Sequence, residues 1–296
     1  MNGVYKNGNT IVRIESDGTK IRYIPDNAIP HPEYPESIDI KITNKCDVTP
    51  LCAMCHEQAC ADGEHADLLD PLLETLKPYT ELAIGGGNPM IHPHLVSFLN
   101  KMKKQNVICN ITVHWKTFTE YFYTLKALQD EELIHGVGVS VNEQVPCEVL
   151  NMLCEMKNIV VHVVMGVAGE EVIRQLQNRG LKILLLGYKM FGRGITYKLL
   201  NKRTVEKNIG WIYDNLEDIM KTFEITSFDN LAVEQLDMKK RLEPELYDKV
   251  FMGEDGSFTM YIDLVKKEYS KSSTSMRYNI DENDISKLFA NLKERY

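Results

Sequence analysis

The pattern of apolar and polar residues along the chain changes near Ser37. Before this point, two short alternating segments flank Ser16-Asp17-Gly18, which predicts a β-hairpin from Thr10 to Pro25. The segment Asp26–Pro35 is rich in proline and is expected to be a linker. After Ser37, short runs rich in Val and Ile alternate with longer amphipathic stretches.

The short runs predict six strands, and the amphipathic stretches predict helices between them. The expected strands are 38–42, 81–84, 107–113, 136–141, 159–165 and 182–186, and the expected helices are 67–76, 95–104, 118–130, 148–157 and 170–179. Repeats of this kind imply parallel strands joined by right-handed crossovers. A closed eight-fold barrel needs about 250 residues and more units than these.

We therefore predict an α/β fold, a partial, open six-fold β/α barrel of parallel strands with a small N-terminal β-hairpin and a C-terminal extension. The expected divisions are 1–36 for the hairpin and linker, 37–238 for the barrel and 239–296 for the extension. Beyond the sixth strand, Thr204–Phe223 is expected to form a long helix and Ser227–Leu236 a further strand. The polar run Tyr269–Tyr278 is either a flexible loop or a cover over the open side of the barrel, anchored by Arg277.

Composition and charge are those of a globular protein. The chain of 296 residues is 44% hydrophobic and 26% charged, with a formal net charge of −8. This charge argues against general nucleic-acid binding, and the basic residues from Lys189 to Lys207 are either solvated surface or a site for an anionic group. No apolar run approaches the roughly 20 residues of a membrane span, and Met1–Tyr5 does not begin a signal peptide. We expect a cytoplasmic protein without a membrane partner.

Three cysteines follow the first predicted strand of the barrel. Cys46, Cys52 and Cys55 can hold three irons of a 4Fe-4S cluster and leave the fourth iron open for a small ligand. A structural zinc site needs four closed ligands. His56 adjoins Cys55 and cannot easily turn to the same metal, whereas Cys60 could serve as the fourth ligand. The spacing favours iron and sulfur, with zinc as the alternative.

The other cysteines show no paired metal spacing. Cys60, Cys109, Cys147 and Cys154 are scattered and are expected to be buried small side chains rather than ligands of a second cluster. A disulfide framework would be unusual in a chain of this length, and an exposed cluster needs a reducing compartment.

A second motif ends the next predicted strand. The apolar run Glu81–Ile84 leads into Gly85, Gly86 and Gly87, which precede Asn88 and Pro89. Consecutive glycines let the backbone come close to a ligand and offer it free N–H and C=O groups. A tight strand-to-helix turn is the structural alternative.

Together, the two motifs resemble the radical S-adenosylmethionine (radical SAM) superfamily. In that family a strand ends in a Cys-x3-Cys-x2-Cys loop, and the second strand ends in a Gly-Gly-Glu-Pro type turn that binds the methionine amino group. The resemblance covers Ser37–Leu186, about half of the chain. The spacing here is Cys-x5-Cys-x2-Cys, with two extra residues within Val48–Leu51, and Asn88 stands where the acidic residue is usual. Asn keeps a carbonyl acceptor but loses the full charge.

The resemblance implies a function and its cofactors. A 4Fe-4S cluster on Cys46, Cys52 and Cys55 would reductively cleave S-adenosyl-L-methionine (SAM), and the resulting 5′-deoxyadenosyl radical would remove hydrogen from a small-molecule or peptide substrate. An electron donor such as flavodoxin or ferredoxin is implied as a partner. The competing hypothesis is a non-catalytic zinc or iron-sulfur binding module.

Further site residues are expected at the carboxyl ends of the strands, where active groups of such barrels collect. By the resemblance, the turn Gly85–Pro89 would bind the methionine part of SAM, and Ser140 and Asn142 would contact its ribose. Lys189 and Arg193 lie in a glycine-containing loop, where a cation could neutralise the carboxylate of SAM or of the substrate. His114 is either a substrate contact or an ordinary loop histidine.

Overall fold

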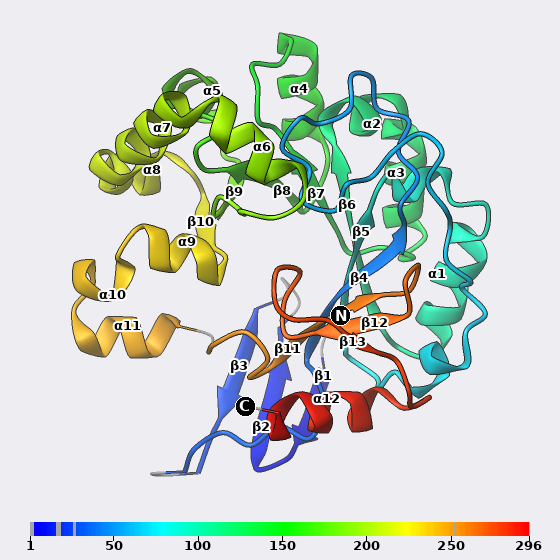
Figure 1. Cartoon of the computed structure of the whole chain (residues 1–296). Helices are drawn as coiled ribbons and strands as arrows, with labels where there is room; N and C mark the ends of the chain where they lie inside the picture. Colours follow the sequence, from blue (N-terminus) through cyan, green and yellow to red (C-terminus); the bar gives the residue numbers. More distant parts are fainter. Residues whose placement is uncertain (1–2, 16–18, 26–27, 252, 296) are drawn as a thin grey trace.

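The computed structural model describes residues 3–15, 19–25, 28–251 and 253–295 (Figure 1). These residues form one large, mostly parallel sheet and one small antiparallel sheet. Figure 1 shows the large sheet as a curved arc, with helices α1–α5 along its outer side. The α/β prediction is confirmed, and the fold is the open barrel that the resemblance to the radical SAM superfamily implied.

All six predicted strands are present and neighbouring strands pair in parallel. They are β4 (Ser37–Thr43), β5 (Glu81–Gly86), β6 (Ile108–His114), β7 (Gly136–Ser140), β8 (Ile159–Val164) and β9 (Lys182–Leu186). Within the described residues the sheet extends beyond these six. The added strands are β10 (Ile225–Phe228), parallel to β9; β11 (Thr259–Asp263), parallel to β4; and the antiparallel β12 (Glu268–Ser270) and β13 (Tyr278–Asn279).

The helices between the strands follow the predicted positions with local differences. They are η1 (Pro71–Thr75), η2 (Pro89–Ile91), α1 (Leu95–Lys104), α2 (Trp115–Glu120), α3 (Phe122–Asp130), α4 (Cys147–Glu155), α5 (Glu170–Leu176), α6 (Arg193–Leu200), α7 (Lys202–Asp214), α8 (Leu216–Thr222), α9 (Asn230–Gln235), α10 (Met238–Arg241), α11 (Pro244–Val250) and α12 (Ile285–Glu294). The expected helix 67–76 is only a short 3-10 turn, which begins where the Asp70 side chain accepts from the Leu72 N–H.

Two predictions for the second half of the chain are wrong in detail. The single helix expected over Thr204–Phe223 is divided at Asn215, which ends α7 and begins α8. The strand expected over Ser227–Leu236 ends at Phe228. There the Asp229 carboxylate accepts from the Ala232 N–H and caps α9, so a helix replaces the strand.

The N-terminal sheet contacts the amino ends of β4 and β5. Strands β1 (Gly3–Asn7), β2 (Thr10–Ile14) and β3 (Lys20–Tyr23) are antiparallel, so the predicted hairpin gains a third strand, while its turn 16–18 lies outside the described residues. Lys20, the first residue of β3, forms an ion pair with Glu81, the first residue of β5, with 2.7 Å between Nζ and Oε2. Residues 26–27 of the expected linker also lie outside the described residues.

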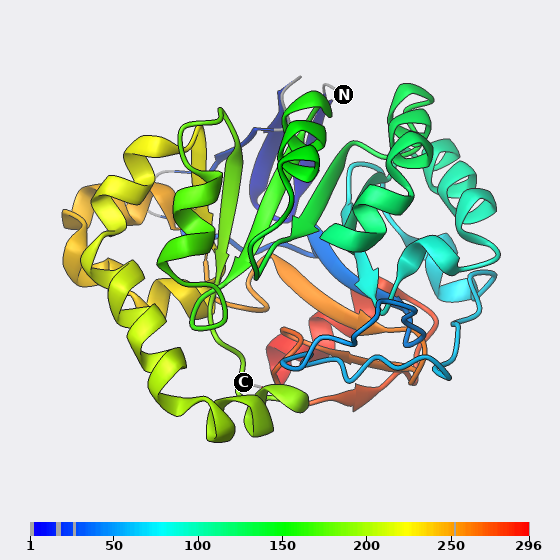
Figure 2. The same cartoon turned by 90° about the horizontal axis from the view of Figure 1, so that it is seen from above.

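The C-terminal segment supplies β11, β12 and β13, which form the edge of the large sheet next to β4. Strand β11 (orange) lies beside β4 (blue), although more than 200 residues separate them, as the view from above shows (Figure 2). Helix α12 packs near η1, where the Ile285 N–H donates to Thr75 Oγ1 at 3.1 Å. In the part of the chain that the structure describes, no helix is long and apolar enough to cross a membrane.

Alternation along the strands separates a packed core from a hollow interior. Apolar side chains such as Ile38, Ile40 and Ile42 face the helices and are fully or almost fully buried. The other side of β4 carries Asp39 and Lys41, which line an interior cavity. A closed β/α barrel fills this interior with bulky branched side chains. Here polar and small residues of β4 to β7 line the cavity together with Val160, Val164, Leu184 and Leu186.

Candidate functional site

A cavity of about 810 Å³ occupies the inside of the curved sheet. This volume lies within the roughly 300–1,000 Å³ of small-molecule and cofactor sites. Its lining includes residues at the carboxyl ends of strands β4 to β10 and residues of the loops that follow them. The carboxyl ends of parallel strands therefore form the rim of the candidate site, as expected for such barrels.

The three cysteines of the first motif, Cys46, Cys52 and Cys55, line this one cavity. Burial, together with the neighbouring Cys55 and Cys46, raises the pKa of the Cys52 thiol to about 11. Burial also raises the pKa of Cys46, with a contribution from Cys55. Bound iron would supply positive charge that offsets the cost of ionising Cys46 and Cys52. Three cysteines are the donor type that a cluster with three protein ligands would use.

Cys60 has a different environment. It is not among the residues that line the cavity, and its thiol interacts with Asp62. Its backbone N–H donates to Asn44 O at 3.0 Å, and its carbonyl accepts from the Cys46 N–H at 2.8 Å, which fixes the base of the cysteine loop. Among the described residues, no group of three or more His, Cys, Asp or Glu side chains closes around a single metal ion. This holds for a set that includes Cys60 and for Cys46, Cys52 and Cys55 alike.

Arg193 holds the cysteine loop from the opposite side of the cavity mouth. Its Nε donates to Cys52 O at 3.1 Å and its Nη1 to Ala59 O at 3.0 Å. The Arg193 N–H donates to Cys55 O at 3.1 Å. We expected a cation of this loop, Lys189 or Arg193, to neutralise the carboxylate of SAM or of the substrate; the Arg193 Nε and Nη1 donate to backbone carbonyls of the cysteine loop. A sequence pattern cannot show such a contact, because about 140 residues separate the partners.

The glycine turn at the end of β5 packs directly on the cysteine loop. Gly86 has φ +122°, and a Cβ there would lie 2.2 Å from Thr43 O. A Cβ on Gly87 would lie 2.0 Å from Lys45 O. Both positions therefore require glycine. Gly85 differs, because a Cβ there would meet nothing within 4 Å and would enter the cavity.

Asn88 and Pro89 are buried away from the cavity, whereas the three glycines of the turn line it. Asn88 is buried, its Nδ2 donates to Asp47 Oδ1 at 2.7 Å, and its Oδ1 accepts from the Met90 N–H at 3.0 Å. Pro89 is buried at the start of η2. Neither residue lines the cavity. The expected ammonium contact through the Asn88 side chain is therefore not available in this arrangement, because both ends of its amide serve the turn and the cysteine loop.

The remaining expected residues face the cavity. Ser140 is the last residue of β7 and Asn142 lies two residues beyond it; the Asn142 Oδ1 accepts from the Val164 N–H at 2.7 Å. Lys189 follows β9, and its Nζ donates to Ser273 Oγ at 2.8 Å. His114 also lines the cavity, and its Nδ1 accepts from the Lys116 N–H at 3.2 Å. Burial lowers the pKa of His114.

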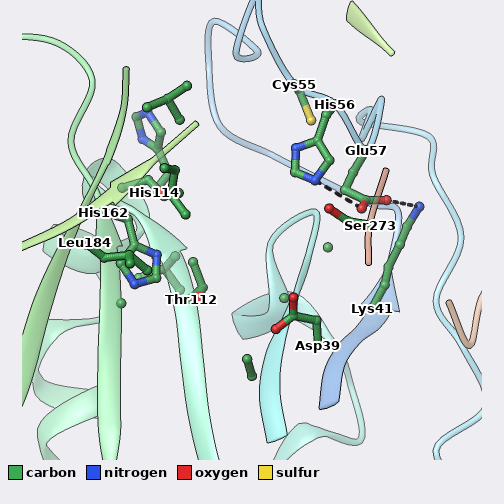
Figure 3. A pocket seen from close by; sticks show the side chains of 18 of the residues that line it. Asp39, Lys41, Cys55, His56, Glu57, Thr112, His114, His162, Leu184 and Ser273 are labelled. Atoms are coloured by element: carbon green, nitrogen blue, oxygen red, sulfur yellow. Dashed lines mark ion pairs between the residues drawn. The ribbon is translucent and has the colours of Figure 1, made fainter. Parts of the chain in front are cut away.

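A buried ion-pair network beside the cysteine loop was missed by the sequence analysis. Lys41 Nζ lies 3.0 Å from Glu57 Oε2 and 3.1 Å from Asp263 Oδ2, and the Lys41 side chain is only 3% exposed (Figure 3). The Tyr261 hydroxyl donates to Glu57 Oε1 at 2.9 Å. The available signal was the pair Asp39 and Lys41, which alternates with isoleucines in an otherwise apolar strand.

The polar run 269–278 covers part of the cavity. Ser273 is buried and lines it, and its carbonyl accepts from Arg277 Nη2. The Arg277 guanidinium lies 4.0 Å from the centre of the Tyr261 ring. Arg277 therefore contacts Ser273, the residue of this run that lines the cavity.

Removing the charge of Lys41 should destabilise the protein strongly. Lys41→Met leaves Glu57 and Asp263 buried without their cation, which typically costs about 3–5 kcal/mol of unfolding free energy. Urea denaturation of the metal-free protein measures this loss. The control Lys221→Met removes an exposed pair with Asp218, where the side chains are 71% and 80% exposed, and should cost less than about 1 kcal/mol. Equal losses in the two variants would contradict the prediction.

Comparison with known proteins gives similarity of fold only. No family model and no curated protein matches the sequence. Streptococcus suis SuiB bound to precursor peptide SuiA is similar with a TM-score of 0.43 and 12% identity, over 87% of this chain and 65% of that chain. A second structure of Streptococcus suis SuiB is similar with a TM-score of 0.44 and 10% identity, over 97% of this chain and 86% of that chain. An aldo-keto reductase enzyme from a Medee basin deep-sea metagenome library has a TM-score of 0.29 and 10% identity, over 86% of this chain and 92% of that chain. The chain thus spans slightly less than two thirds of the peptide-bound SuiB chain.

Proposed function

We propose that this protein is a radical SAM enzyme, with a 4Fe-4S cluster on Cys46, Cys52 and Cys55 and SAM in the adjoining cavity. The observation that supports this most strongly is that three thiols and the open face of Gly85 border the same cavity at the carboxyl ends of the strands. A site that only bound a structural metal would have no need of an adjoining cavity of about 810 Å³.

Each residue has a proposed task in this site. When bound, the cluster supplies the electron that cleaves the sulfonium C–S bond of SAM, which yields the radical that removes hydrogen from the substrate. The three thiolates hold three irons, and Arg193 keeps their loop in position through its backbone carbonyls. Gly85 leaves room for the methionine part of the cofactor.

Lys189 is the proposed partner of the cofactor carboxylate. Its Nζ contacts Ser273, and within the described residues it forms no ion pair with a carboxylate, so its charge is available to a ligand. Ser140 and the Asn142 amide nitrogen are the proposed ribose contacts. The Asn142 oxygen accepts a backbone hydrogen bond, and its amide N–H groups would donate to the ribose.

The proposal extends to the surroundings of the protein. An exposed cluster needs a reducing compartment, so the cytoplasm is the proposed location. An electron donor such as flavodoxin or ferredoxin would reduce the cluster there. The run 269–278 and the N-terminal sheet would exclude water from the mouth and the floor of the cavity.

Release of 5′-deoxyadenosine tests the proposed function. Protein reconstituted without oxygen should bind about four irons and four sulfides per chain. Dithionite and SAM should then yield 5′-deoxyadenosine slowly even without substrate, whereas protein that has not been reconstituted should yield none. SAM should be supplied well above micromolar levels, because the Asn88 side chain is not free to bind it. A full cluster signal with neither product nor a SAM-dependent spectral change would reject the proposal, and one tightly held zinc would favour the binding module.

A further inference from the structure

The cavity continues below the proposed cofactor residues to a polar floor. Asp39, Ala83, Asn110 and Gly136 are register partners on the adjacent strands β4 to β7 and form one row across the interior. Gly85 lies two residues beyond Ala83, so this row is about 7 Å below the glycine turn at about 3.3 Å per residue. All four residues line the cavity. Small and polar side chains here leave space that the cofactor residues do not use.

Asp39 is the one charged residue of this row. Figure 3 shows its carboxylate pointing into the cavity, with His162 on the opposite wall. In the described part of the chain, no hydrogen bond or ion pair joins the Asp39 carboxylate to a protein group. Burial raises its pKa; Lys189 opposes this shift, while Asp255, Asp229 and Glu57 add to it. The Asp39 side chain is exposed to the cavity and is not packed against protein groups, so a carboxylate without a partner there is open to a ligand.

The other cations of the cavity do not pair with Asp39. Lys41 pairs with Glu57 and Asp263, and Arg193 donates to carbonyls of the cysteine loop. Lys189 donates to Ser273 and does not hydrogen-bond to Asp39. The carboxylate therefore lacks a close counter-charge from the protein, and a cationic ligand would supply one.

His162 adds a neutral polar group to the same space. Burial lowers the pKa of its imidazole to about 4, so the ring is uncharged near neutral pH. A Cβ on Gly138 would lie 2.3 Å from the His162 ring, so the absence of a side chain at Gly138 makes room for this ring. The two walls then offer an anion and an uncharged ring, a combination that accepts a cation and does not repel it.

We propose that the floor of the cavity is the substrate site and that the substrate is a small molecule presenting an ammonium or guanidinium group to Asp39. This assignment rests on the proposed function, since it is the radical chemistry that makes the bound molecule a substrate. The position below Gly85 places such a molecule deeper in the barrel than the cofactor residues.

Calorimetric titration of the reconstituted, SAM-bound protein tests the assignment. The probes are butylamine and butylguanidine, with 1-butanol and butyrate as neutral and anionic compounds of similar size. A cationic probe should bind saturably to the unaltered protein. Asp39→Asn should weaken this binding at least about tenfold, because the carboxylate would be lost at nearly constant size. Asp218→Asn makes the same chemical change on the surface, where that side chain is 80% exposed, and should change nothing.

Several results would overturn the assignment. These are no saturable binding of a cationic probe at millimolar concentration, preferential binding of butyrate, or undiminished cation binding by Asp39→Asn. A matching loss of SAM affinity in Asp39→Asn would assign the carboxylate to the cofactor instead. Failure of the proposed function would appear separately, as the absence of a cluster or of SAM cleavage in the unaltered protein.

Discussion

Cys55→Ala is expected to lower the iron content of the reconstituted protein from about four per chain to below about one. The same result is expected for Cys46→Ala and Cys52→Ala. The reason is geometric: Cys46, Cys52 and Cys55 are the cysteines that line the cavity in the described part of the chain, so none of them has another thiol there to replace it. Iron and sulfide analysis, together with the visible absorbance of the anaerobic protein, measures the loss.

Cys60→Ala is the matched control for these variants. Cys60 belongs to the same loop but does not line the cavity, so its replacement should leave the iron content unchanged. The folded state should survive all four substitutions, because Cys60 fixes the base of the loop through its backbone N–H and carbonyl. Loss of the cluster in Cys60→Ala together with its retention in Cys46→Ala would show that the ligand assignment is wrong.

The parts of the fold that depend on local pattern were predictable. The strand at Lys182–Leu186 and the helix at Leu95–Lys104 have the expected bounds, because each is a short apolar or amphipathic segment between clear polar boundaries. The pairing of β11 with β4 was not predictable. It joins segments more than 200 residues apart, and no periodicity within either segment identifies its partner.

In the candidate site, too, local patterns were predictable and long-range contacts were not. The spacing of the three cysteines and the glycine turn directed attention to one rim, and these residues do lie around one cavity. The tasks of Asn88 and Arg193 depend on partners elsewhere in the chain, Asp47 for the first and the carbonyls of Cys52 and Ala59 for the second. A motif identifies the residue type at a position, whereas long-range contacts decide which of its atoms remain free.

The glycine turn offers a test that separates ligand binding from folding. Gly86→Ala should destabilise the metal-free protein, because a Cβ would lie 2.2 Å from Thr43 O and φ is +122°. Backbone strain of this kind costs about 1–3 kcal/mol before the steric clash is counted. Gly85→Val should be tolerated, since its Cβ would meet nothing within 4 Å and a β-branched residue suits a strand. Urea denaturation distinguishes the two variants.

Gly85→Val should nevertheless weaken SAM binding at least about tenfold, which corresponds to about 1.4 kcal/mol. The new side chain would occupy the space beside the cysteine loop in which the methionine part of SAM is proposed to lie. Equilibrium binding of SAM to the reconstituted variant measures the loss, and an unchanged iron content shows that the cluster is intact. If Gly85→Val kept both its cluster and its normal SAM affinity, the open face of the turn would not be the cofactor site, and the turn would serve only to pack β5 against the cysteine loop.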